Sequence, residues 1–336
     1  MQSLRNFFAL ALLVVSSQVQ AQALAQAPVA APAILPPVVV SGLRPGPGLW
    51  KVSSGEHALW ILATVSPVPR NMEWYSPRSE AVLRQSKEVL GTPGMSAMIG
   101  WGSAFKVAFA MPTIMRARLL PDDKTLRDVL PTELHARWLA SKAQYLAKDK
   151  NLERWRPMFA ADRLYSAALA SAGLQSGTGT EKRIRKLSTQ QHLKYTSNTV
   201  SHAITDPRGV AKSFAKAKID EVACFRSVLD RLDADVAHAA RRANAWAVGD
   251  VAELTRLVRR DERDPCLETF QATEVAQTLG MRDGLARSRN KWLASADAAL
   301  ANNDVSFAAL PMKEMLDSDG LLARLRASGY QVTAPE

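Results

Sequence analysis

The side chains that most often carry chemistry are scattered through this sequence. The five histidines do not form a His-Glu-x-x-His pattern, in which two histidines one helical turn apart bind zinc. They are His57, His135, His192, His202 and His238. The sequence also lacks the Gly-x-Ser-x-Gly turn of serine hydrolases and the glycine-rich loop with lysine that binds nucleotide phosphates. We therefore interpret the histidines as ordinary surface or strand residues.

The two cysteines, Cys224 and Cys266, are too far apart for a Cys-x-x-Cys motif, and no histidine lies near enough in sequence to suggest a zinc site. In an oxidising compartment such a pair either forms one disulfide or stays as two buried thiols. We favour the disulfide. It would close a loop of about 43 residues and stabilise the fold by roughly 4 kcal/mol on the chain-entropy model.

The formal net charge of +11 makes the chain basic, which permits binding to nucleic acid, an anionic polysaccharide or a membrane surface. The densest basic runs, at residues 182–186 and 256–263, are interleaved with acidic or apolar residues. This pattern favours solvated basic helix faces. No nucleic-acid-binding motif accompanies the runs, so we predict no nucleic-acid partner.

The first 21 residues have the pattern of a signal peptide. A single cation, Arg5, precedes an apolar run at residues 7–15, and Val19 and Ala21 supply small residues for cleavage. The run is shorter than the about 20 residues that cross a bilayer, although an uncleaved anchor is the alternative. Residues 22–47 are rich in alanine and proline and predict an extended linker. We therefore expect a periplasmic or secreted protein with no transmembrane segment in the mature chain, and one folded domain at 48–336.

Strands are predicted at both ends of this domain. Apolar runs at 49–52 and 57–65 flank a turn, Ser76 and Pro77 begin a helix, and a short strand covers 88–90. Near the C-terminus, a helix over 281–300 precedes a strand at 305–310, a helix at 320–327 and a strand at 329–333. This order predicts an α/β (α+β) fold, whose mixed central sheet is built from N- and C-terminal segments and flanked by helices.

A large helical insertion is predicted at about 126–300. Helical periodicity marks residues 132–139, 155–168, 219–232 and 236–248, with Gly249 ending the last of these helices and Asp250 capping the next. A strand-bearing stretch is expected at 194–200, and a turn at 206–209. The tryptophans at apolar positions favour core packing over a sugar-stacking surface. They are Trp50, Trp60, Trp138, Trp155, Trp246 and Trp292.

The order of these elements resembles that of the TraB/GumN family, relatives of the Tiki-type metalloproteases. The resemblance covers about residues 48–333, and its specificity comes from the order and spacing of short motifs. The motifs are Leu-Trp-Lys-Val at 49–52 with Leu-Trp-Ile-Leu at 59–62, Trp-Tyr-Ser-Pro at 74–77, Ser-Arg-Asn-Lys-Trp-Leu at 288–293, and Phe-Ala-Ala-Leu at 307–310 followed by Gly-Leu-Leu at 320–322 and Gly-Tyr at 329–330.

In active members, the resemblance implies two Gly-x-x-His motifs, one after the second strand and one after the late strand, with a glutamate between them. Two imidazoles and a carboxylate would bind a divalent metal that activates water. Here Ser66 and Glu314 stand at the histidine positions and Gly91 at the glutamate position, with Glu88 three residues earlier as a substitute. Hydroxyl and carboxylate oxygens favour only weak binding of hard cations. We therefore predict no cofactor, with a weakly bound divalent metal as the alternative.

The resemblance also places Arg289 and Asn290 at the cleft, where an arginine would clamp a carboxylate or phosphate. The alternative is an ordinary helix-surface arginine beside a capping asparagine. The sequence thus favours a non-catalytic (pseudoenzyme) binding or scaffold protein of the cell envelope, whose partner is an envelope protein, a peptide or an anionic polymer. The alternative is a divergent metal-dependent peptidase that uses Glu88, Glu314 and Arg289, or recruits Asp317 and Asp319.

Overall fold

The computed structural model describes most of the region after the predicted linker. The described residues are 46, 48–70, 76–98, 104–176, 179–217, 219–258, 270–271 and 273–335. All of them belong to the second of two compact units, Leu35–Glu336. The predicted signal peptide, Trp74, Tyr75 and Cys266 lie outside the described residues, as does all of the predicted linker except Gly46.

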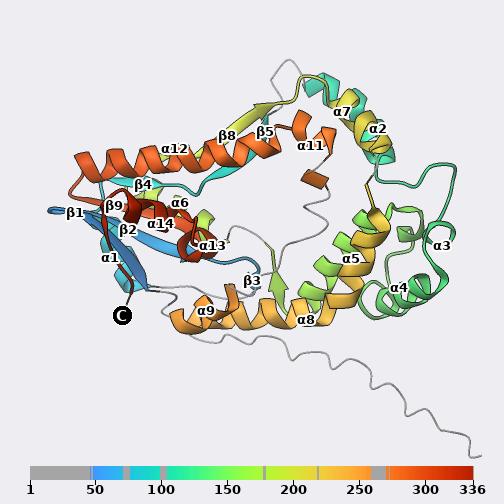
Figure 1. Ribbon diagram of the computed structural model, residues 1–336, viewed down its shortest axis with the longest axis horizontal. Coiled ribbons are helices and arrows are strands. Elements are labelled where there is room, and N and C mark those ends of the chain that lie inside the picture. The colour runs from blue at the N-terminus through green and yellow to red at the C-terminus, as the bar shows by residue number, and fades with distance from the viewer. Residues whose placement is uncertain are drawn as a thin grey trace, which may run out of the picture. The chain divides into compact units, whose positions relative to one another are not determined.

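The largest sheet of the described residues has six strands and is mixed; β1, β2, β4 and β9 of this sheet are labelled on the left of Figure 1. Its strands, in spatial order, are β10 (Gln331–Thr333), β1 (Leu49–Ser54), β2 (His57–Thr64), β9 (Val305–Pro311), β4 (Glu88–Leu90) and β7 (Lys194–Thr196). The pairs β10–β1 and β1–β2 are antiparallel, whereas β2, β9, β4 and β7 run parallel. The predicted mixed sheet, assembled from the two ends of the domain, is confirmed.

The two central strands are apolar because both of their faces are covered. Leu59, Ile61 and Leu62 of β2 are fully buried, as is Phe307 of β9. Such continuous apolar runs are typical of parallel strands between layers of helices. The β1–β2 hairpin turns at Gly55, whose φ of 57° lies in the left-handed region that glycine adopts without strain.

Helices from distant parts of the chain cover this sheet. α1 (Pro77–Gln85) packs on β9, and its N-cap Ser76 accepts a hydrogen bond from the Ser79 amide at 3.2 Å. α12 (Met281–Asn302) packs on β2, β4 and β9 and buries Trp292. The shorter helices that flank the same core are α6 (Gly179–Gln190), α9 (Val251–Val258), α13 (Met312–Leu316) and α14 (Leu321–Ala327).

A second core is mainly helical. It is built from α3 (Leu126–Val129), α4 (Thr132–Tyr145), α5 (Pro157–Ser171) and much of α8 (Glu221–Val248). Trp138 meets Phe225 edge-on here, with ring centroids 5.6 Å apart. The C-terminal end of α8 joins the first core, where the Trp246 indole donates a hydrogen bond to the Ala63 carbonyl at 2.7 Å. Helix α8 therefore connects the two cores.

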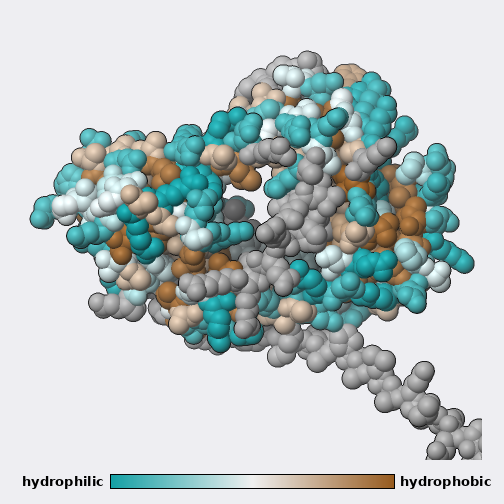
Figure 2. All heavy atoms as spheres, viewed as in Figure 1, coloured by the Kyte–Doolittle hydropathy of each residue, from teal (hydrophilic) through white to brown (hydrophobic). Residues whose placement is uncertain are grey.

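The remaining elements form smaller groups. β5 (Gly94–Met98) pairs in parallel with β8 (Thr199–Ala203), and α12 packs on both strands. β3 (Val68–Pro69) pairs with β6 (Leu174–Gln175), and η2 (Leu152–Arg154) precedes α5. α2 (Ala104–Arg116) packs on α7 (Pro207–Lys216), which also contacts α11 (Glu274–Thr278). In Figure 2 the visible surface is largely hydrophilic, with hydrophobic residues showing in several separate patches.

Two expectations about the elements were wrong. α8 is one helix of 28 residues, although two were expected, because its acidic stretch at 233–235 contains no glycine or proline to break it. The expected turn at 206–209 begins α7, with Asp206 as N-cap and Pro207 as the first helical residue. The strand-bearing stretch expected at 194–200 is confirmed, since it contains β7 and the first residues of β8.

Other expectations are confirmed or remain open. Trp50, Trp138, Trp246 and Trp292 are buried in the two cores. Gly249 ends α8 in the left-handed conformation, and Asp250 caps the next helix, as expected.

Cys224 is buried on α8, and its disulfide with Cys266 stays a prediction. Within the described part of the chain, no helix is both long enough and apolar enough to cross a bilayer. The division into signal peptide, linker and single domain also stays a prediction.

Candidate functional site

The three positions that the family pattern singles out follow three neighbouring parallel strands. β9 lies between β2 and β4, with Thr64 paired to Pro311 and Leu90 to Ala308. Ser66 comes just after β2, Gly91 directly after β4, and Glu314 in the helix after β9. Because carboxyl ends of parallel strands share one edge of a sheet, these positions lie at the same edge. We refer to Ser66, Gly91 and Glu314 as the strand-end site.

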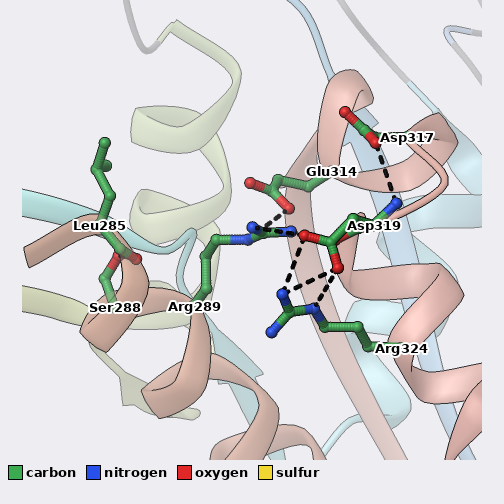
Figure 3. A network of polar contacts seen from close by, with 7 residues as sticks. All are labelled: Leu285, Ser288, Arg289, Glu314, Asp317, Asp319 and Arg324. Carbon is green, nitrogen blue, oxygen red and sulfur yellow. Dashed lines mark hydrogen bonds and ion pairs between the residues drawn. The ribbon is translucent and has the colours of Figure 1, made fainter. Parts of the chain in front are cut away.

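Arg289 of α12 reaches the acidic end of this site (Figure 3). Its Nε lies 3.2 Å from Oε2 of Glu314, and its Nη1 lies 3.6 Å from Oδ2 of Asp319. Its Nη2 also donates a hydrogen bond to the Asp319 carbonyl oxygen. The side chains of Arg289 and Glu314 are only 25% and 23% exposed, so solvent screens their ion pair incompletely. The predicted anion clamp is therefore engaged by the protein's own carboxylates.

A second arginine completes this cluster. Arg324 of α14 binds Asp319 through its Nε at 3.2 Å from Oδ1 and its Nη2 at 3.0 Å from both carboxylate oxygens. Asp317 accepts a hydrogen bond from the Asp319 amide at 3.0 Å, which shapes the turn between α13 and α14 (Figure 3). At Gly320 a Cβ would lie 2.5 Å from the Glu314 carbonyl oxygen, so the turn needs glycine there. Asp319 therefore serves both the turn and the arginines, whereas Asp317 serves the turn.

At Gly91 the space for a side chain is already filled. A Cβ there would lie 2.4 Å from the Tyr195 Oη and 2.9 Å from its Cζ. The Gly91 backbone is fixed, since its amide donates to the Thr196 carbonyl at 2.9 Å and its carbonyl accepts from the Asn198 amide group at 2.9 Å. Asn198 is fully buried. A tyrosine from β7 thus occupies the place where a glutamate would project.

The Tyr195 phenol is held in its neutral form. Burial raises its pKa above the ordinary value, and the nearby Glu181 carboxylate raises the pKa further. Arg185 acts in the opposite direction, with its guanidinium carbon 4.7 Å from the centroid of the Tyr195 ring. The group that fills the strand-end site beside Gly91 is therefore an uncharged hydroxyl near neutral pH.

Glu88 does not join this site. It is the first residue of β4, so it lies at the amino end of the strand, at the opposite edge of the sheet. Its buried carboxylate contacts the Lys194 Nζ at 3.0 Å and accepts a hydrogen bond from the Asn303 side chain at 3.2 Å. The structure therefore does not gather Glu88 with Glu314 and Arg289, as the alternative peptidase required.

The last two positions named by the sequence are exposed. Ser66 is exposed after β2, and its carbonyl oxygen accepts a hydrogen bond from Arg242 of α8 at 2.7 Å. Asn290 is exposed on α12 beside Arg289. The sequence did not reveal the parts played by Arg242 and Tyr195. Only the pairing of β7 with β4 and the packing of α8 bring them to this edge of the sheet.

The model of the TraB/PrgY/gumN family matches residues 48–334. The chain belongs to this family. The matched range agrees with the range expected from the short motifs, so the resemblance is confirmed. No curated protein and no solved structure matches the chain.

The strand-end site of this TraB/PrgY/gumN member does not fit a divalent metal. Ser66 offers a hydroxyl, Gly91 offers no ligand, and Glu314 offers a carboxylate that Arg289 already contacts. Across the residues that the structure describes, no group of three or more histidine, cysteine, aspartate or glutamate side chains is placed to hold a metal ion. The side chains at these three positions therefore differ from the metal-ligand set that the family pattern implies for active members, which is two imidazoles and one carboxylate.

Proposed function

We propose that this family member is a non-catalytic binding or scaffold protein of the cell envelope, a pseudoenzyme built on a metallohydrolase-like fold. The observation that carries the proposal is the ion pair between Arg289 and Glu314. It places a fixed positive charge beside the acid of the strand-end site. A site that activates water through a metal needs the opposite arrangement, with several ligands free to donate electron pairs.

The electrostatics of the pair leave little net attraction for a second cation. Two unit charges 4 Å apart interact by about 4 kcal/mol at an effective dielectric constant of about 20. A divalent ion bound to Glu314 would meet the guanidinium of Arg289 at a comparable distance, so a repulsion of roughly 8 kcal/mol would offset its attraction to the carboxylate. Ser66 and Gly91 supply no further negative charge. A hydroxyl and one shared carboxylate are a weak ligand set for such an ion.

The envelope location rests on the amino-acid pattern of residues 1–21. A lone cation, an apolar run and small residues before a cleavage site are typical of exported proteins. On this proposal the mature chain works in the periplasm or outside the cell, where an envelope protein, a peptide or an anionic polymer is its partner. A disulfide between Cys224 and Cys266 is compatible with that compartment.

A peptide-library digest tests the absence of catalysis. The purified protein is incubated with the library and with Mn²⁺, Co²⁺ or Zn²⁺, in the presence and absence of a chelator. The same digest is run on Glu314→Ala and on a matched control, Glu274→Ala, which changes an exposed glutamate of α11. We expect no cleavage by any of the three proteins. Cleavage that disappears with chelator and in Glu314→Ala, but persists in Glu274→Ala, would establish a divergent hydrolase instead.

A further inference from the structure

A cavity of about 350 Å³ lies among α2, α5, α7 and α11, away from the strand-end site. Aliphatic and aromatic side chains form its wall, including Ile114, Phe159, Val210, Phe214 and Leu279. Of the described residues that line the cavity, Arg118 alone is charged, and none of the others offers a polar side chain. Its size is within the usual range of small-molecule sites, about 300–1,000 Å³.

The aromatic part of the wall is held in place by its neighbours. The Phe159 and Phe214 rings lie 5.6 Å apart between centroids, and Phe214 lies 5.9 Å from Phe270. The guanidinium carbon of Arg156 lies 4.7 Å from the Phe214 ring centroid, and Arg156 itself is fixed by a buried ion pair with Glu221. A wall with so many fixed contacts is preformed, so a ligand does not have to order it.

Arg118 brings a positive charge to the edge of this apolar space. Its guanidinium carbon lies 4.4 Å from the Trp155 ring centroid and 5.9 Å from that of Phe159, which lines the cavity. No carboxylate of the described residues lies within ion-pair distance of Arg118, whereas Arg154 and Arg156 each have an acidic partner. Two aromatic faces hold the guanidinium, but they leave its hydrogen-bond donors available.

We propose that this cavity binds a free medium-chain fatty acid, with the acyl chain between the helices and the carboxylate on Arg118. An apolar wall with a single cation complements an apolar chain with a single negative charge. It does not complement sugars or nucleotides, whose polar groups would be desolvated without partners. A water molecule takes up about 30 Å³, and a methylene group is of similar size, so the cavity accommodates a chain of about ten to twelve carbons.

Calorimetric titration of the full chain with decanoate, below its micelle-forming concentration, tests the proposal. We expect saturable binding of one decanoate per chain. Each methylene removed from the ligand should weaken binding about fourfold, so hexanoate should bind far more weakly. Ala211→Phe places a ring in the cavity and should abolish binding, with its thermal unfolding checked to show that the variant folds.

Arg118→Gln removes the positive charge and leaves the apolar wall of the cavity intact, so it tests the two contributions separately. It should weaken decanoate binding at least tenfold and leave binding of the uncharged decanol unchanged. The matched control, Lys212→Gln, removes an exposed cation of α7 that does not line the cavity, and it should change neither ligand. Absence of saturable decanoate binding would overturn the proposal. The proposal would also be overturned if Arg118→Gln and Lys212→Gln weakened decanoate binding equally. Binding to phospholipid vesicles but not to free decanoate would overturn it as well.

Discussion

Substitution of Gly91 by alanine tests whether Tyr195 truly fills the strand-end site. Gly91 does not adopt a positive φ, so its backbone conformation suits alanine, which without a clash would stabilise the protein by about 0.4–1 kcal/mol. The new Cβ, however, would lie 2.4 Å from the Tyr195 Oη. Overpacking of this kind costs about 1–3 kcal/mol. Because the phenol is the outer end of a side chain, part of the strain can relax, and we expect a net loss of about 1 kcal/mol.

Urea unfolding of the wild type, Gly91→Ala, Tyr195→Ala and the double variant measures this effect. In the Tyr195→Ala background the clash is gone, so Gly91→Ala should be neutral or stabilise by up to about 1 kcal/mol. Gly94→Ala is the matched control, since a Cβ at Gly94 would meet nothing closer than the Thr199 hydroxyl at 3.7 Å. The reasoning is refuted if Gly91→Ala is as neutral as Gly94→Ala, or if its cost persists without the tyrosine.

Three further predictions address the ion pairs. Glu221→Gln should lower the free energy of unfolding by about 3–5 kcal/mol, because it leaves Arg156 charged and buried; a loss below about 1 kcal/mol in urea unfolding would contradict this. Arg289→Gln should lower the free energy of unfolding by about 1 kcal/mol, measured by thermal unfolding. Glu314→Gln should then destabilise the Arg289→Gln variant less than it destabilises the wild type. Strictly additive effects of the two substitutions would rule out the ion pair. Burial raises the pKa of Glu153, but hydrogen bonds from three α4 side chains outweigh burial and lower the pKa below 4.5. The stability that ionised Glu153 contributes is therefore complete above pH 4.5 and is lost as the pH falls through the lowered pKa of the folded state. The difference in free energy of unfolding between the wild type and Glu153→Gln should thus shrink on acidification. A difference that is independent of pH would contradict this prediction.

Local signals predicted much of the fold. The apolar runs of β2 and β9 favoured strands, covered on both faces in the case of β2, and Ser76 followed by Pro77 marked the start of α1. The same signal at Asp206 and Pro207 was present but was interpreted as a turn. The single helix α8 was harder to foresee, because its acidic middle is unfavourable for a buried helix yet tolerable on an exposed face.

The site was predictable only in part. The family resemblance grouped Ser66, Gly91 and Glu314 as one ligand set, and the direction of β4 could have excluded Glu88, which begins that strand. The position of Tyr195 depends on the pairing of β7 with β4, which no local pattern encodes. The contact between Arg289 and Glu314 likewise depends on how α12 packs against the segment after β9.

The metal content of the protein tests the central claim most directly. Purified wild type and Glu314→Ala are dialysed against Mn²⁺, Co²⁺ or Zn²⁺, then against metal-free buffer, and analysed for bound metal. We predict far less than one metal ion per chain in the wild type, with no difference between the two proteins. One tightly held ion per wild-type chain that is lost in Glu314→Ala would contradict the account.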